Sequence, residues 1–67
     1  MAVARVTEIS STSPKSFDDA IQQGVSRATK TLRNVRGAWV KEQRVDIKDD
    51  KIAEYQVNLM VTFVLED

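Results

Sequence analysis

Residues 53–65 read Ala-Glu-Tyr-Gln-Val-Asn-Leu-Met-Val-Thr-Phe-Val-Leu, the most regular pattern in the chain. Every odd-numbered position from Ala53 to Leu65 is apolar or aromatic, whereas the positions between them are mixed. A period of two residues is typical of a β-strand that packs one face on a core. We therefore predict a strand over residues 52–66. Its second face carries, in order, Ile52, Glu54, Gln56, Asn58, Met60, Thr62 and Val64.

A helix is predicted upstream of this strand, over residues 14–34. Its apolar residues recur every three or four positions, which indicates one helical face. Ser13 offers a hydroxyl N-cap, and Pro14 suits the first helical position. Gly24, inside the helix, suggests that the sheet approaches closely there. The apolar face consists of Phe17, Ala20, Ile21, Gly24, Val25, Ala28, Leu32 and Val35.

Two further strands complete the expected elements. Residues 2–9 alternate β-branched and polar side chains, and the Ser/Thr-rich stretch 10–13 that follows is typical of a loop. Residues 38–47 form a strand with imperfect alternation, joined to the last strand by a charged turn at 48–51 that has no glycine, so its type stays open. On strict alternation, one face of the second strand carries Gly37, Trp39, Lys41, Gln43, Val45 and Ile47.

The predicted class is α+β: a β-α-β-β subunit in a single domain, residues 1–67, with a three-stranded antiparallel sheet partly wrapped around one helix. A helix of about 21 residues is ~31 Å long, whereas a strand of about 15 residues runs ~50 Å. Part of the apolar sheet therefore stays uncovered, which indicates an interface. Since 67 residues without cysteine lack both a large core and disulfides, we expect a symmetric homo-oligomer.

Composition narrows the classes of function. Ten Lys and Arg balance ten Asp and Glu, so the basic excess typical of a nucleic-acid binder is missing. No apolar run approaches the ~20 residues that span a bilayer, and the N-terminal residues do not resemble a signal peptide. We expect a cytoplasmic protein without nucleic-acid or membrane partners. Histidine and cysteine, the commonest general base and a common nucleophile, are both absent, so no enzyme is expected.

The chain resembles the dodecin family along nearly its whole length. The stretches that carry the resemblance are Thr12-Ser13-Pro14, Asp19-Ala20-Ile21, Thr31-Leu32-Arg33-Asn34-Val35, Tyr55-Gln56-Val57 and Val61-Thr62-Phe63-Val64-Leu65-Glu66-Asp67. The resemblance implies a hollow shell of twelve subunits that binds flavins such as riboflavin or FMN, often as stacked pairs at two-fold axes. It also implies storage and protection of the flavin rather than turnover. Some members of the family also bind coenzyme A.

The resemblance also suggests which residues hold a flavin. A tryptophan near the start of the second strand covers the ring in the family, and ungapped alignment puts Gly37 at that position, with Trp39 two residues later. A shift of two keeps the side chain on the same face, displaced by ~6.6 Å. Trp39 therefore either stacks on a ligand in a different pose or fills a subunit interface. Gln56, in Tyr-Gln-Val, is expected to hydrogen-bond to the flavin edge.

Arg44 and its neighbour Gln43 complete the expected cofactor site. Arg44 matches an arginine of many bacterial dodecins, and it suits either a ligand phosphate or an ion pair between subunits. The partners considered for that ion pair are Glu42, Asp46 and Glu54.

Two sets of acidic residues could be either functional or structural. The carboxylates of Asp46, Asp49 and Asp50 suit a hard cation or a solvated hairpin tip. A catalytic pair of Glu42 and Glu54 is not favoured by the spacing. The alternative to flavin storage is a dodecin-like shell that binds coenzyme A, a metal ion or nothing.

Overall fold

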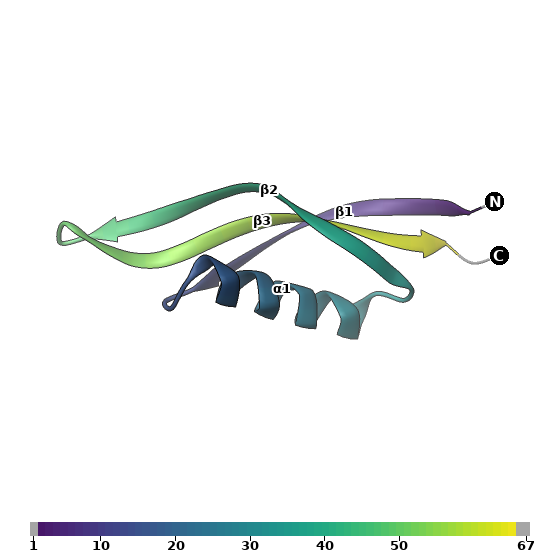
Figure 1. The fold of residues 1–67 in the computed structure, drawn as a ribbon, viewed down its shortest axis with the longest axis horizontal. Coiled ribbons are helices and arrows are strands. Elements are labelled where there is room, and N and C mark those ends of the chain that lie inside the picture. Colours follow the sequence, from purple (N-terminus) through teal and green to yellow (C-terminus); the bar gives the residue numbers. More distant parts are fainter. Residues whose placement is uncertain (1, 66–67) are drawn as a thin grey trace.

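The computed structural model describes residues 2–65 and confirms the predicted β-α-β-β order. The elements are β1 (Val3–Ser13), α1 (Phe17–Thr31), β2 (Val35–Lys48) and β3 (Lys51–Leu65), shown in Figure 1. The sheet order is β1-β3-β2, and both outer strands run antiparallel to β3. The strand with the longest alternation is therefore the central one.

β1 extends to Ser13, so the prediction of a strand ending at residue 9 and a loop over 10–13 is wrong. Ser11 and Ser13 lie opposite Val57 and Tyr55 of β3, on the side of the sheet that α1 covers. A serine side chain is small enough to fit under a closely packed helix, and Ser13 is fully buried. Packing against α1 thus overrides the local preference of serine for loops.

The helix is shorter than the predicted 14–34 at both ends. Ser16, rather than Ser13, is the N-cap, and its Oγ accepts a hydrogen bond of 3.0 Å from the backbone N–H of Asp19. Pro14 accordingly lies in the connection and not at the first helical position. At the other end the backbone leaves the helix at Leu32, and Asn34 adopts a left-handed φ of 60° that starts β2 at Val35, earlier than the predicted 38.

Ser13 closes the connection between β1 and α1 instead of capping the helix. Its Oγ accepts from the backbone N–H of Lys15 at 3.0 Å and donates to Oδ2 of Asp19 at 2.5 Å. The Gln23 amide donates to the same carboxylate oxygen at 2.7 Å. The hydrogen bonds from Ser13 and Gln23 hold the pKa of Asp19 below its usual range because they favour the charged carboxylate.

The core lies between α1 and the middle of the sheet. Its buried apolar residues are Ala20, Ala28, Val57, Leu59 and Val61. The predicted close approach at Gly24 is confirmed, because a Cβ there would lie 2.9 Å from Cδ1 of Leu59 and 3.1 Å from Cβ of Ser11. Helix residues at this site must therefore be small.

The helix covers only part of the sheet, as predicted. A helix of 15 residues is about 22 Å long, whereas the molecule extends over 51 Å. Figure 1 shows α1 beneath the middle of the sheet, with the β2–β3 hairpin projecting at one end and the start of β1 and the end of β3 lying at the other. The hairpin turns at Asp49 and Asp50, whose φ values of 55° and 64° match the positive φ that a type I′ turn requires.

Candidate functional site

A β-bulge at Lys41 determines which side chains of β2 share a face. Val40 lies opposite Leu59, whereas Glu42 lies opposite Asn58, so β2 advances two residues while β3 advances one. The extra residue reverses the alternation of the strand beyond it. Just before residue 41 the even-numbered side chains of β2 face the helix, whereas after it the odd-numbered ones do.

This reversal brings Arg44 to the face of the sheet that points away from α1, where Gly37, Trp39 and Gln56 also lie. Trp39 lies opposite Met60, and Arg44 lies opposite Gln56. Gln43 lies opposite the buried Val57 and hence on the helix side. The prediction that Trp39 and Gln43 share a face is wrong because it assumed unbroken alternation.

The sequence does contain a signal for the bulge. The apolar residues that face the helix side of β2 occupy even positions, Ala38 and Val40, near its start, and odd positions, Val45 and Ile47, near its end. A switch of parity within one strand indicates one inserted residue. The imperfect alternation of the predicted strand 38–47 has this physical cause.

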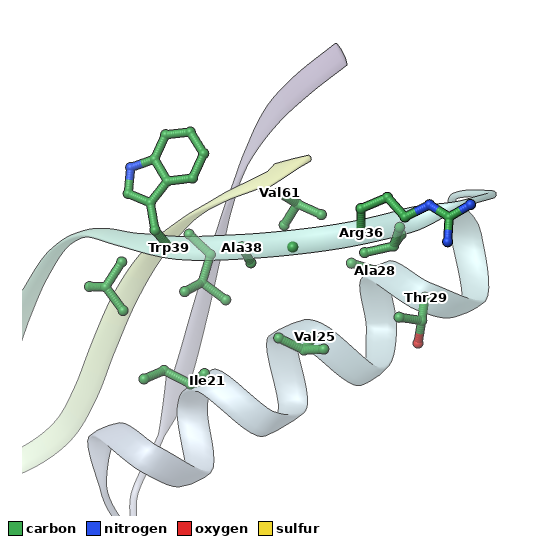
Figure 2. A pocket seen from close by; sticks show the side chains of 12 residues that line it. Ile21, Val25, Ala28, Thr29, Arg36, Ala38, Trp39 and Val61 are labelled. Atoms are coloured by element: carbon green, nitrogen blue, oxygen red, sulfur yellow. The ribbon is translucent and has the colours of Figure 1, made fainter. Parts of the chain in front are cut away.

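Trp39 presents an open aromatic surface. Its side chain points away from α1, as Figure 2 shows, and 53% of the residue is exposed. Gly37 lies opposite Thr62 on the same face, and a Cβ at Gly37 would meet no atom within 4 Å. The position at which the resemblance implies a tryptophan is therefore open as well.

Gln56 is held in place by its neighbours on the same face. Its Nε2 donates to Oγ of Ser10 at 3.1 Å and to Oδ1 of Asn58 at 3.3 Å. Both amide protons are thus engaged, whereas Oε1 of Gln56 accepts no hydrogen bond within residues 2–65 and can accept one from a ligand. A ligand that donates an N–H at its edge suits this arrangement.

The polar network continues across the sheet in a way that sequence reasoning missed. Asn58 donates through Nδ2 to Oε2 of Glu8 at 3.3 Å and to Oε1 of Glu42 at 3.1 Å. Lys41, the bulge residue, contacts Oε1 of Glu8 at 3.2 Å. These partners lie up to 50 positions apart, so only the register of all three strands brings them together.

The two carboxylates considered as a catalytic pair lie apart. Glu42 faces Asn58, whereas Glu54 faces Asp46, so their positions are separated by four residues of β3, or about 13 Å. Glu42 is instead a hydrogen-bond acceptor in the network of Asn58. The spacing gives no support for paired general acid and base chemistry.

Arg44 makes only a weak contact within the chain. Its Nη2 lies 3.9 Å from Oδ1 of Asp46, and the two side chains are 67% and 45% exposed. Exposed pairs of this kind contribute little to stability, so the guanidinium stays available to an anion. Within one chain the carboxylate beside Arg44 is that of Asp46, and the ion pair between subunits stays a prediction.

Two features are absent from the described part of the chain. Within residues 2–65, no three acidic side chains gather as cation ligands, and Asp46, Asp49 and Asp50 form no such cluster. The single helix of this part is not long and apolar enough to cross a membrane.

This architecture defines a class of small β-α-β-β subunits in which one helix leaves much of a long sheet uncovered. The sequence matches the family profile described as Dodecin over residues 3–66, and the chain belongs to the dodecin family. The family consists of small flavin-binding shell proteins, and its structures indicate homo-oligomeric assembly.

Individual relatives agree with this assignment. The dodecin of Thermus thermophilus is 42% identical over 65 residues, covering 97% of this chain and 94% of the relative. The structure of a dodecin from Streptomyces davaonensis matches with a TM-score of 0.92 at 41% identity, covering 98% of this chain and 97% of that one. A calcium dodecin from Mycobacterium tuberculosis, described as having a novel calcium-binding site, matches with a TM-score of 0.84 at 31% identity, covering 96% and 91%.

Proposed function

We propose that this protein binds riboflavin or FMN in a hollow homododecamer and stores the flavin in the cytoplasm without catalysing a reaction. The observation that carries the proposal is the bulge at Lys41, which aligns Trp39 and Arg44 with Gln56 on one open face. Membership of a family of flavin-binding shell proteins supports the same ligand class.

In this proposal each residue has a distinct role. The exposed indole of Trp39 stacks on the flat isoalloxazine ring. Oε1 of Gln56 accepts from the N–H at the ring edge, since the Gln56 amide protons already bind Ser10 and Asn58. The Arg44 guanidinium, opposite Gln56, meets the phosphate when the ligand is FMN. Gln43, on the helix side, is left out of the proposed contacts.

The spacing of these residues favours a site shared between subunits. Met60, the partner of Trp39, lies four residues along β3 from Gln56, which corresponds to about 13 Å. One ring stacked flat on Trp39 is thus poorly placed to reach Gln56 of the same copy. A second copy that faces the first around a two-fold axis brings its own Gln56 to the ring.

A titration with fluorescence detection tests the proposal. Flavin-free protein is added to riboflavin and to FMN, and the mass of the protein is measured by light scattering. We expect quenching at micromolar or lower concentration and a mass of twelve 7.6-kDa subunits. A twelve-subunit mass without quenching would contradict flavin binding while keeping the shell.

The variant Trp39→Ala, with Trp39→Tyr as the matched aromatic control, tests the stacking role. We expect Trp39→Ala to weaken flavin binding about tenfold, since an aromatic pair contributes ~0.5–1.5 kcal/mol beyond its buried area. The mass of the assembly should stay unchanged. A lower mass for Trp39→Ala would instead show that Trp39 packs a subunit interface.

Calcium is the second candidate ligand because one similar structure is a calcium dodecin. The acidic side chains within residues 2–65 offer no ready cluster for it. Calorimetric titration of the flavin-free protein with CaCl₂ separates the two functions. Calcium binding without flavin quenching would favour this second candidate.

A further inference from the structure

The side chain of Gln56 is one end of a hydrogen-bonded network that crosses all three strands on the face of the sheet pointing away from α1. At the centre of this network is Asn58, which lies between Ser10 of β1 and Glu42 of β2 in register. Gln56 is two positions away on the same strand, so both amides share a face, and both are half-buried. The network therefore connects the amide proposed to bind a ligand with charged groups that this amide does not contact itself.

Two carboxylates determine which way the Asn58 amide points. Its Nδ2 donates to Oε2 of Glu8 at 3.3 Å and to Oε1 of Glu42 at 3.1 Å. An ionised carboxylate only accepts hydrogen bonds. The opposite orientation of the amide would turn its own acceptor, Oδ1, toward these oxygens, and both hydrogen bonds would be lost. Oδ1 of Asn58 therefore points away from the carboxylates and toward Gln56.

Lys41, the extra residue of the bulge in β2, supports Glu8 in this role. Its Nζ lies 3.2 Å from Oε1 of Glu8, whereas Asn58 binds the other oxygen, Oε2. Both oxygens of Glu8 thus have a donor, and the ammonium offsets one of the two negative charges beside Asn58. The bulge therefore supplies a cation to the network in addition to reversing the alternation of β2.

Asn58 in turn determines the orientation of the Gln56 amide. Since Oδ1 of Asn58 is an acceptor, the group of Gln56 that faces it must be the donor Nε2, at 3.3 Å. The second amide proton of Gln56 binds Oγ of Ser10 at 3.1 Å. Ser10 does not select this orientation, because a hydroxyl can donate as well as accept. The acceptors Glu8 and Glu42 do select it, through Asn58.

We propose that Asn58 is a positioning residue, which turns Oε1 of Gln56 toward the ligand and thereby selects ligands that donate an N–H. Glu8 and Glu42 act only through Asn58. The inference rests on the proposed flavin site, since the imide N–H of the flavin ring is such a donor. An acceptor that a ligand covers without offering it a donor weakens binding. A ring that presents a methyl group at this edge should accordingly bind less tightly.

Fluorescence titration with riboflavin, and with riboflavin methylated at the imide nitrogen, measures this preference as a ratio of dissociation constants. Wild type should bind riboflavin about tenfold more tightly, the factor expected from one unsatisfied acceptor. In Asn58→Leu the Gln56 amide can turn its Nε2 toward the methylated ring, so the ratio should fall by about threefold or more. The steric effect of the methyl group is the same in both proteins, so the change in the ratio reports the orientation of the amide.

Ser10→Ala is the matched control, because it removes the other hydrogen-bond partner of the Gln56 amide without releasing its orientation. Its affinity for both ligands can fall, but the ratio should keep the wild-type value. A wild-type ratio in Asn58→Leu would overturn the positioning role. An equal loss of preference in Ser10→Ala and Asn58→Leu would overturn it as well, because Asn58 would then act no differently from any other neighbour of Gln56.

A second measurement needs no ligand and therefore separates this inference from the proposed function. In flavin-free protein, NMR measures how fast the side-chain amide protons of Gln56 exchange with water. Glu8→Gln/Glu42→Gln keeps the shape of both side chains but lets Asn58 reverse, because an amide can donate as well as accept. Exchange at Gln56 should then become faster, although Gln56 bonds to neither position.

Glu54→Gln is the control for this measurement, because Glu54 lies opposite Asp46 and outside the network. It should leave the exchange at Gln56 unchanged. Equal exchange rates in wild type and in the Glu8→Gln/Glu42→Gln variant would overturn the positioning role. Faster exchange in that variant, in a protein that does not bind riboflavin, would contradict the proposed function and still support the control of Gln56 through Asn58.

Discussion

At the scale of single residues, Gly37 and Trp39 separate this chain from the family pattern that it otherwise follows. Both lie on the open face of β2, opposite Thr62 and Met60. Gly37 has no positive φ, and its Cβ direction is unobstructed, so neither backbone nor space demands a glycine. A tryptophan is therefore sterically admissible at either position, and in the proposed flavin site the choice between the two would shift the stacking ring by ~6.6 Å along the strand.

Moving the tryptophan from position 39 to position 37 should restore flavin affinity. In the proposed flavin site, Gly37→Trp combined with Trp39→Ala should bind riboflavin about tenfold more tightly than Trp39→Ala alone, since aromatic stacking contributes ~0.5–1.5 kcal/mol. Fluorescence quenching measures the two dissociation constants. Gly37→Leu in the same background is the matched control for added apolar area. Equal affinities of the tryptophan and leucine variants would contradict a stacking role at this position.

At the scale of elements, the join between β1 and α1 depends on one carboxylate. Asp19 accepts from Ser13, the last residue of β1, and from Gln23, one turn further along α1. Because Ser13 is fully buried, its hydroxyl needs this partner. The helix start thus moves from the predicted Ser13–Pro14 to Ser16–Phe17, since the hydroxyl of Ser13 is already committed.

The lowered pKa of Asp19 predicts a pH dependence of stability. A carboxyl whose pKa is lower in the folded state stabilises the fold above its unfolded pKa of about 3.9, and this contribution is lost as pH falls through the folded pKa. Asp19→Asn should therefore lower the thermal midpoint at pH 7, and its difference from wild type should shrink below about pH 4. Circular dichroism measures both midpoints.

Asp18→Asn is the matched control for the join, because Asp18 also lies in the first turn of α1 and is exposed. It removes a charge near the helix N-terminus without touching Ser13 or Gln23. Its effect on the midpoint should be smaller than that of Asp19→Asn. A difference between Asp19→Asn and wild type that stays constant from pH 7 to pH 2 would contradict the role of the ionised carboxylate.

At the scale of the whole molecule, the subunit is a long sheet whose single helix is too short to cover its apolar face. The 51 Å length leaves apolar side chains exposed at both ends, including Val3 and Leu65 at one end and Ile47 and Ile52 at the other. Exposed apolar surface of this extent is typical of interfaces rather than of free monomers. Folding and assembly should accordingly be coupled.

Coupling of folding to assembly predicts a stability that depends on concentration. When the folded state is an oligomer, mass action raises the thermal midpoint as the protein concentration increases. We expect a measurable rise of the midpoint over a hundredfold range of concentration, followed by circular dichroism with light scattering at each point. If the thermal midpoint does not change with protein concentration and light scattering gives the mass of a monomer, the conclusion that the subunit needs partners to be stable would be wrong.

Periodicity alone predicts the element order and the core face of β3, and the ratio of helix length to strand length predicts that the subunit needs partners. The resemblance to the family suggested Trp39, Arg44 and Gln56 as site residues, which stays a prediction, whereas strict alternation wrongly put Trp39 on one face with Gln43. Only the tertiary structure decided the ends of β1 and α1, where packing of serines beneath the helix outweighs local propensity. It alone decided which side chains share a face of β2, because a bulge depends on pairing with β3 and not on β2 alone.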